Sequence, residues 1–229
     1  MHGASSGATK LLAAVGAAGA VGFLLQRDPS PPGFRMVTKA LPMLCLLLWM
    51  WPPRTRYARW IFAGLGLSLL GDLLLEVGPG FFLPGLGAFL LAHLGYTAAY
   101  LHVSRAPRPA RALPFLVLAV AASGLLHPWL GAMAVPVTLY VAVICAMAWR
   151  AAALLGDAHA SRDRQWAAFA GALLFAASDG VLAIKLFVRP LPGGGFVVMV
   201  LYWAAQLSIA LSTREPRRHP APPPATTTA

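Results

Sequence analysis

The sequence contains little charge. Only 11% of its 229 residues are Asp, Glu, Lys or Arg, against about 25% in a typical soluble domain. Hydrophobic residues make up 59% of the chain, and one soluble core of this length cannot hide that much apolar surface from water. The composition therefore excludes a soluble globular domain and indicates a protein whose solvent is lipid.

Cysteine is also scarce, and the common catalytic clusters are missing. The two cysteines, Cys45 and Cys145, both lie inside apolar runs, which predicts packing side chains and no disulfide framework. No Ser-His-Asp motif and no cluster of metal ligands is evident in the sequence. We therefore expect neither a metal nor another cofactor.

Acidic residues are few, and the net charge is +11. In a soluble protein this excess would suggest a nucleic-acid partner. Here the eighteen basic residues are scattered among short loops instead of gathering on one helix face. Membrane topology explains this distribution better, so we expect membrane lipids rather than nucleic acid as partners.

Eight apolar segments follow one another along the chain, separated by connections rich in Pro and Gly. A membrane span needs about 20 residues, with roughly 17 as the lower limit. The pattern predicts an all-α fold, a polytopic membrane bundle of about eight transmembrane helices. Lys10 and the apolar run after it are also compatible with a signal peptide, cleaved near the small residues Ala18 to Ala20. The spans are placed at residues 11–26, 36–51, 58–76, 81–103, 112–126, 129–149, 165–188 and 195–212.

The loop charges predict the orientation of this bundle by the positive-inside rule. Thirteen basic residues fall on the side that holds both termini and three fall on the other, which places both termini in the cytosol. Residues 1–213 should form a single membrane domain, and residues 214–229, rich in Pro, Thr and Arg, a disordered cytosolic tail. The thirteen are Lys10, Arg54, Arg56, Arg59, Arg105, Arg108, Arg111, Arg150, Arg162, Arg164, Arg214, Arg217 and Arg218; the three are Arg27, Arg35 and Arg189.

Two aspartates lie within predicted spans, Asp72 in 58–76 and Asp179 in 165–188. A carboxylate at the centre of a bilayer costs roughly 2.5–3.5 kcal/mol, so each needs a partner or a function. The surroundings are alike, Gly71-Asp72-x-x-Leu75 and Ser178-Asp179-x-x-Leu182, on spans that run in the same direction. A parallel internal repeat and chance similarity both explain this likeness.

Polar residues at helical spacing predict a shared polar pocket between the spans. Ser68, Asp72 and Glu76 form one stripe, and His93, Tyr96 and Tyr100 recur on one face of the next span. Tyr202 and Gln206 are four residues apart on the last span. We assign a function to Asp72, Asp179 and His93, and hydrogen bonds between helices to Ser68, Tyr100 and Tyr140. Glu76 is either a solvated helix end or a participant.

Lys39 and Lys185 lie near the outer ends of their spans, where a lysine usually extends to the membrane interface. For Lys39, binding an anionic lipid head group is an equal alternative. For Lys185 the interfacial position is favoured over a Schiff base with retinal.

Five short motifs, spread in order from residue 38 to residue 206, carry a family resemblance. With them the sequence resembles the lysoplasmalogenase family, eight-span membrane proteins known in bacteria as YhhN-like. The resemblance implies hydrolysis of the sn-1 vinyl ether of a lysoplasmalogen, with an ethanolamine or choline head group, to a fatty aldehyde and the glycerophospho-alcohol. The motifs are Thr38-Lys39, Ser68-x-x-Gly71-Asp72-x-x-Leu75, Gly87-Ala88-Phe89-x-x-x-His93-x-x-Tyr96, Gly171-Ala172-x-x-Phe175-x-x-Ser178-Asp179-x-x-Leu182-Ala183 and Tyr202-x-x-Ala205-Gln206.

That reaction suits the intramembrane residues. Vinyl ethers hydrolyse by protonation at carbon followed by capture of water, and two buried carboxylates can divide the acid and base roles. Asp72 and Asp179 are the expected acid and base, in either order, and His93 orients one of them or carries the proton. The expected substrate-binding residues are Lys39, Tyr96, Ser178, Tyr202 and Gln206.

Three other classes of protein remain open. A proton-coupled transporter would also use intramembrane Asp and His. An intramembrane aspartyl protease would need Gly-x-Gly-Asp, but position 69 is Leu. A lipid-binding or assembly protein would show no turnover.

The expected location is a bacterial inner membrane, or the endoplasmic reticulum in a eukaryote, and the oligomeric state stays open.

Overall fold

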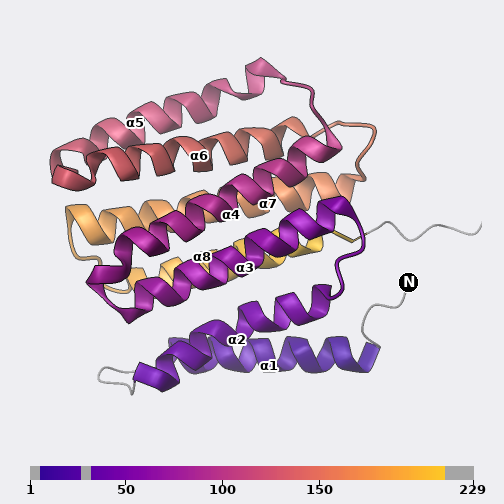
Figure 1. The fold of residues 1–229 in the computed structure, drawn as a ribbon, viewed down its shortest axis with the longest axis horizontal. Coiled ribbons are helices and arrows are strands. Elements are labelled where there is room, and N and C mark those ends of the chain that lie inside the picture. The colour runs from indigo at the N-terminus through magenta and orange to yellow at the C-terminus, as the bar shows by residue number, and fades with distance from the viewer. Residues whose placement is uncertain (1–5, 27–31, 215–229) are drawn as a thin grey trace, which may run out of the picture.

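In a computed structural model, the chain forms a bundle of long α-helices (Figure 1). The structure describes residues 6–26 and 32–214, and this part contains helices and connections but no strand. The all-α fold is therefore confirmed. Arg27, Arg217, Arg218 and residues 215–229 of the predicted tail lie outside the described residues. The helices are α1 Ser6–Leu24, α2 Pro32–Met50, α3 Arg56–Val77, α4 Phe82–Val103, α5 Leu113–Leu130, α6 Ala134–Ala153, α7 Arg162–Ala183 and α8 Gly194–Leu211.

The helices have the length and composition of membrane spans. They contain 18 to 22 residues, or about 27–33 Å at 1.5 Å per residue, which matches a hydrocarbon core of about 30 Å. Seven helical stretches within the described residues are long and apolar enough to cross a membrane. One of them, Pro109–Ala153, contains both α5 and α6. The chain is an integral multi-pass membrane protein, and the count of eight spans stays a prediction.

The turn between α5 and α6 corrects one predicted boundary. The sixth span was expected to begin at residue 129, but α5 continues to Leu130 and α6 begins at Ala134. A 3₁₀ turn, Gly131–Met133, separates them. Gly131 has φ +49° at the end of the helix, a positive value that glycine adopts without strain. Hydropathy is high on both sides of the turn and therefore did not locate it.

Sequence neighbours pack as antiparallel pairs, and the pairs α3–α4, α7–α8 and α1–α2 make the most extensive contacts. Figure 1 shows α3 and α4 in the middle, with α7 and α8 behind them. The pair α5–α6 lies along one side and α1–α2 along the other. The two helices that carry Asp72 and Asp179 thus belong to the central pairs.

Capping and small residues fix the position of these two helices. The side chain of Thr55 accepts a hydrogen bond from Ala58 N at the start of α3, and Ser161 does the same for Arg164 N at the start of α7. A Cβ atom at Gly71 would lie 3.0 Å from the carbonyl oxygen of Gly85, so only a glycine lets α3 and α4 approach this closely. This contact fixes the position of α3 at the residue that precedes Asp72.

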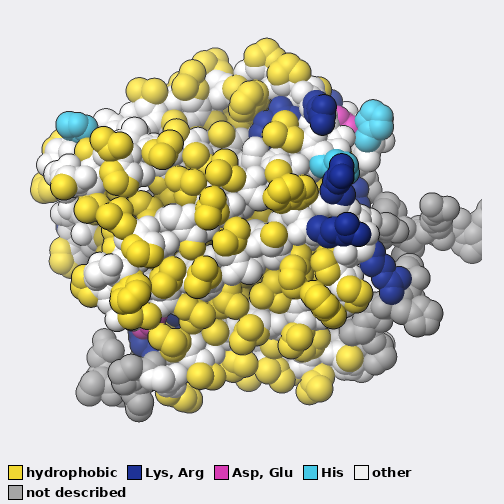
Figure 2. All heavy atoms as spheres, viewed as in Figure 1, with side chains coloured by type: hydrophobic (Ala, Val, Ile, Leu, Met, Phe, Trp, Pro, Cys, Tyr) yellow, Lys and Arg dark blue, Asp and Glu magenta, His cyan; other side chains and the backbone are white. Residues whose placement is uncertain are grey.

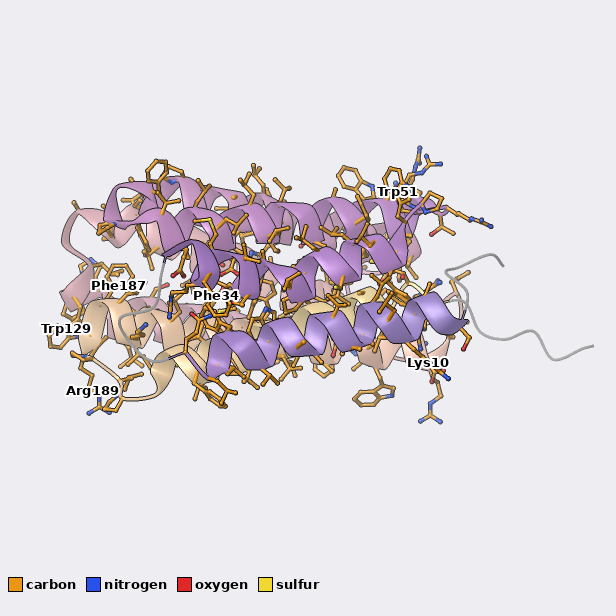
Figure 3. The ribbon with its side chains drawn as sticks, turned by 90° about the horizontal axis from the view of Figure 1, so that it is seen from below. Lys10, Phe34, Trp51, Trp129, Phe187 and Arg189 are labelled. Atoms are coloured by element: carbon orange, nitrogen blue, oxygen red, sulfur yellow. The ribbon has the colours of Figure 1, made fainter. Side chains whose placement is uncertain are left out.

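The surface is apolar over most of the bundle, while lysine and arginine side chains gather mainly at one end (Figure 2). Helix α1 begins and α8 ends at the same end (Figure 1). Lys10 and Trp51 lie at that end, and Trp129, Phe187 and Arg189 lie at the other (Figure 3). Tryptophans at both ends are typical of the two membrane interfaces. The arrangement fits the predicted asymmetry of charge, and the cytosolic location of the termini stays a prediction.

A reporter that is active only in the cytosol is expected to be active when it is fused to the C-terminus. The reason is the excess of basic residues in the loops on that side. A fusion in the connection between α7 and α8, at residues 189–193, is the matched control and should be inactive. A silent C-terminal fusion in well-expressed, membrane-inserted protein would overturn the orientation.

Candidate functional site

Two neighbouring cavities lie between the helices. The larger has a volume of about 630 Å³ and is lined by Arg35, Lys39, Asp72, Glu76 and Lys185 among other residues; we call it the polar cavity. It lies at the end of the bundle where α3 ends and α4 begins, near Phe187 in Figure 3.

The smaller cavity has a volume of about 150 Å³ and is bounded mainly by apolar side chains of α4, α5, α6 and α7. Asp179 and Tyr140 bring polar atoms to its wall, and we call it the apolar cavity. Leu75, Phe82 and Phe187 line both cavities. The single shared pocket expected from the sequence is therefore divided into a polar and an apolar part with a common wall.

An ion-pair network connects α2 and α3 at the polar cavity. Lys39 Nζ lies 2.9 Å from Asp72 Oδ1 and 2.9 Å from Glu76 Oε2, and it donates to the Asp72 carbonyl at 3.3 Å. Arg35 Nε contacts Glu76 Oε1 at 2.5 Å. Lys39 is only 6% exposed, which contradicts the interfacial position, one of the two equal alternatives that the sequence left open for it. Two carboxylates on one face of α3 hold it inside, and Glu76 is a participant in the network.

Asp72 keeps one oxygen free. Its Oδ1 is bound by Lys39, whereas Oδ2 is buried and has no hydrogen-bond partner in the described part of the chain. The ion pair offsets part of the cost of burying the carboxylate. The free oxygen belongs to a side chain that lines the polar cavity, so it can accept a hydrogen bond from a bound ligand or from water.

Asp179 has a different surrounding. Its carboxyl group accepts a hydrogen bond from the Tyr140 hydroxyl. Within residues 6–26 and 32–214 it makes no ion pair. The sequence assigned Tyr140 a hydrogen bond between helices, and the structure shows that this bond goes to a candidate catalytic carboxyl group. No spacing within α6 signals this contact, because it joins two helices.

His93 is completely buried and lines neither cavity. Its Nδ1 lies 2.6 Å from the carbonyl oxygen of Phe89. Because a carbonyl only accepts, Nδ1 carries the hydrogen, and Nε2 has no partner among the described residues. The ring packs edge-on against Phe175 and Tyr140, with centroids 4.6 and 5.3 Å away. His93 thus contacts the tyrosine that binds Asp179, and not Asp179 itself.

The remaining predicted residues form a buried layer behind the cavities. Tyr96 donates to Gln206 Oε1 at 2.8 Å, and Ser178 donates to the Val198 carbonyl at 2.9 Å. None of these side chains lines either cavity. Tyr202 lies close enough to both Asp72 and Asp179 for an electrostatic interaction with each.

Arg35 is a participant that was not predicted, because its place at the start of a span suggested only a loop charge. A signal existed: Arg35 and Lys39 are four residues apart on α2, as Asp72 and Glu76 are on α3. Two such pairs of opposite charge in successive spans predict contact across the helices. The pair Lys39–Asp72 and the pair Tyr140–Asp179 are the polar centres of the site.

The comparison with known proteins identifies the family. The model of the YhhN family matches residues 34–213, which include every candidate site residue. The chain belongs to the YhhN family. The resemblance found in the sequence motifs is therefore confirmed.

Curated relatives match most of the chain. It is 38% identical to lysoplasmalogenase TMEM86B of Homo sapiens over 189 residues, 78% of this chain and 75% of the relative. It is 36% identical to lysoplasmalogenase TMEM86A of Bos taurus over 207 residues, 82% and 81% of the two chains. The lysoplasmalogenase of Mycobacterium bovis is 37% identical over 162 residues, 66% of this chain and 58% of the relative. No solved structure matches the chain.

Proposed function

We propose that this protein is a lysoplasmalogenase, a membrane hydrolase that cleaves the sn-1 vinyl ether bond of a lysophospholipid. The products are a fatty aldehyde and glycerophosphoethanolamine or glycerophosphocholine. The observation that carries the proposal is the 38% identity to a lysoplasmalogenase over 78% of this chain. The paired polar and apolar cavities support it, because the substrate has a charged head and a long apolar chain.

The chemistry requires an acid, a water molecule and a base. Protonation of the alkenyl carbon beta to the ether oxygen gives an oxocarbenium ion. Water adds to the adjacent carbon and loses a proton, and the resulting hemiacetal collapses to aldehyde and alcohol. General acid and base groups typically contribute about 10²–10⁴-fold each to such steps.

The surroundings of the two aspartates support a division of these roles, with Asp179 as the acid. Its cavity suits the alkenyl chain, and a carboxyl group without a cation is more stable in its neutral form in apolar surroundings. Tyr140 occupies one carboxyl oxygen and leaves the other available to deliver the proton to carbon. Tyr140 is thus a positioning residue.

Asp72 is then the base. Lys39 holds Oδ1, and the free Oδ2 can accept the proton of the attacking water. The carboxylate also places negative charge near the oxocarbenium ion, where charge develops in the transition state. The carbon that water attacks is the one nearer the head group, which agrees with the position of Asp72 at the polar cavity.

The other predicted residues have supporting roles in this proposal. Tyr202 lies behind the cavities, and we assign it an electrostatic effect on the two carboxyl groups. His93 orients Tyr140 through the ring contact. Lys39 acts on Asp72, and we assign Tyr96, Gln206 and Ser178 to holding the helices around the site.

A proton-coupled transporter is not favoured, because the relatives that cover most of the chain are lysoplasmalogenases. The host membrane belongs to the proposal: a bacterial inner membrane, or the endoplasmic reticulum in a eukaryote.

Purified protein in detergent is expected to convert lysoplasmenylethanolamine to fatty aldehyde and glycerophosphoethanolamine in equal amounts, as followed by mass spectrometry. Turnover should not need a proton gradient. In water labelled with heavy oxygen, the glycerophosphoethanolamine should carry no label, because water attacks the alkenyl carbon and the bond from that carbon to the glycerol oxygen breaks. Labelled glycerophosphoethanolamine, or the absence of both products, would contradict the proposal.

A further inference from the structure

We propose that Lys185 and the first turn of α8 bind the phosphodiester of the lysophospholipid head group in the polar cavity, so that the alkenyl chain extends into the apolar cavity. This inference rests on the proposed lysoplasmalogenase function. It assigns the head group to a lysine other than Lys39, whose ammonium group is already bound by two carboxylates.

The charges that line the polar cavity leave one cation unpaired. Arg35 and Lys39 are bound to Glu76 and Asp72. Lys185 makes no ion pair with any residue in the described ranges, and its side chain is exposed. The cavity wall therefore carries an excess of one positive charge, which matches the single negative charge of a phosphodiester. Lysine binds phosphate as a compact point charge.

The N-terminus of α8 lies beside this lysine. A Cβ atom at Gly195 would be 3.6 Å from Lys185 Nζ, and Gly195 lines the polar cavity. The N–H of Gly194 donates to the carbonyl oxygen of Leu191, and the N-cap residue, Gly193, has no side chain that could accept from the following N–H groups of the first turn. The first N–H groups of a helix have no partner within it and carry a partial positive charge, which favours an anion.

A buried atom in the same cavity independently points to a ligand. Asp72 is 5% exposed, and its Oδ2 has no hydrogen-bond partner in the described part of the chain. A buried polar atom without a partner is costly, and a hydroxyl group of a bound ligand or a water molecule satisfies it. Because a carboxylate oxygen has two lone pairs, Oδ2 can accept from a glycerol hydroxyl of a lipid held by Lys185 and from the attacking water at the same time.

The end of α7 sets the distance between head group and reacting bond. A π-helical segment, Ile184–Val188, continues α7 and brings Lys185 to the polar cavity and Phe187 to the common wall. Asp179 and Lys185 are six residues apart, or about 9 Å along a helix at 1.5 Å per residue. Seven covalent bonds separate the phosphorus of a lysoplasmalogen from the carbon that is protonated. When extended, they span a comparable distance.

Two substrates and four proteins test the inference. The substrates are lysoplasmenylethanolamine and the corresponding 1-alkenylglycerol, which has no phosphate. Lys185→Gln should raise KM for the phospholipid by about tenfold or more, the effect expected for a charge-assisted contact, with kcat within about twofold of the wild-type value. For 1-alkenylglycerol, KM should not change, and Lys185→Arg should restore most of the affinity for the phospholipid.

Arg189→Gln is the matched control. It removes the same charge at the same end of the bundle (Figure 3), from an exposed side chain that does not line the polar cavity. Both of its KM values should equal those of the wild type. An equal effect of Lys185→Gln on both substrates, or no effect on either, would overturn the assignment.

A binding measurement separates failure of this inference from failure of the proposed function. Dissociation constants of the saturated 1-alkyl lysophospholipid and of 1-alkylglycerol need no turnover. Lys185→Gln should abolish the preference for the phospholipid even in a protein that hydrolyses neither vinyl ether. Inorganic phosphate alone should compete poorly, because it lacks the chain. Displacement of the lipid by low concentrations of phosphate would indicate a free-anion site and overturn the head-group assignment.

Discussion

Asp179→Asn is expected to lower the turnover of lysoplasmenylethanolamine at least about a hundredfold, the low end for loss of a general acid or base. Asparagine keeps the size of the side chain and can still accept the hydrogen bond from Tyr140, but it cannot deliver a proton to carbon. Because Asp179 has no ionic partner within the described residues, the substitution leaves no buried charge unpaired. The thermal stability should therefore stay near that of the wild type.

Asp72→Asn should lower turnover to a similar extent, but with a second effect. Lys39 would keep only Glu76 as an anionic partner, so the melting temperature should also fall. The double variant should be little worse than the worse single variant, because losses that affect one mechanism are not additive.

Asp157→Asn provides the control for both substitutions. Asp157 is also buried, but it lies in the connection between α6 and α7, where it contacts His159, and it lines neither cavity. The turnover per folded molecule of the Asp157→Asn variant should be near that of the wild type. Rate and thermal unfolding are measured on the same detergent-purified samples, and near-normal turnover in Asp179→Asn or Asp72→Asn would remove that aspartate from the mechanism.

A saturated 1-alkyl lysophospholipid should bind but give no detectable turnover. The alkyl ether has no double bond to accept a proton, so the oxocarbenium ion cannot form by this route. Its head group and chain fit the two cavities as those of the substrate do, and it should act as a competitive inhibitor with an inhibition constant close to the KM of the vinyl ether. Product analysis by mass spectrometry tests the absence of turnover, and steady-state inhibition kinetics test the competitive binding.

The ester-linked lysophospholipid is the complementary test. Cleavage of an ester needs an activated nucleophile or water activated by a metal. Neither cavity is lined by a serine or a histidine from the described residues. The release of fatty acid should therefore be negligible beside the release of aldehyde from the vinyl ether. Comparable rates for the two lipids would show that the carboxyl groups do not work by protonation of carbon.

The sequence by itself determined the class of the fold and the main candidates for the site. Composition required lipid as solvent, and the length of the apolar runs set the helices within a few residues. The four-residue spacing of Asp72 and Glu76 was enough to place both on one face of a helix. These features are local: the helical backbone sets its own period, and transfer from water to lipid acts on each segment separately.

Only the tertiary structure decided which polar groups meet. The pairing of Lys39 with Asp72 and of Tyr140 with Asp179 depends on how neighbouring helices are rotated and how closely they approach. Small residues such as Gly71 control that approach through contacts with another helix. Hydropathy cannot report these contacts, because lipid and the interior of a helix bundle are equally apolar and the choice between them rests on shape and hydrogen bonding. For the same reason, the division into a polar and an apolar cavity appeared only when the helices were packed together.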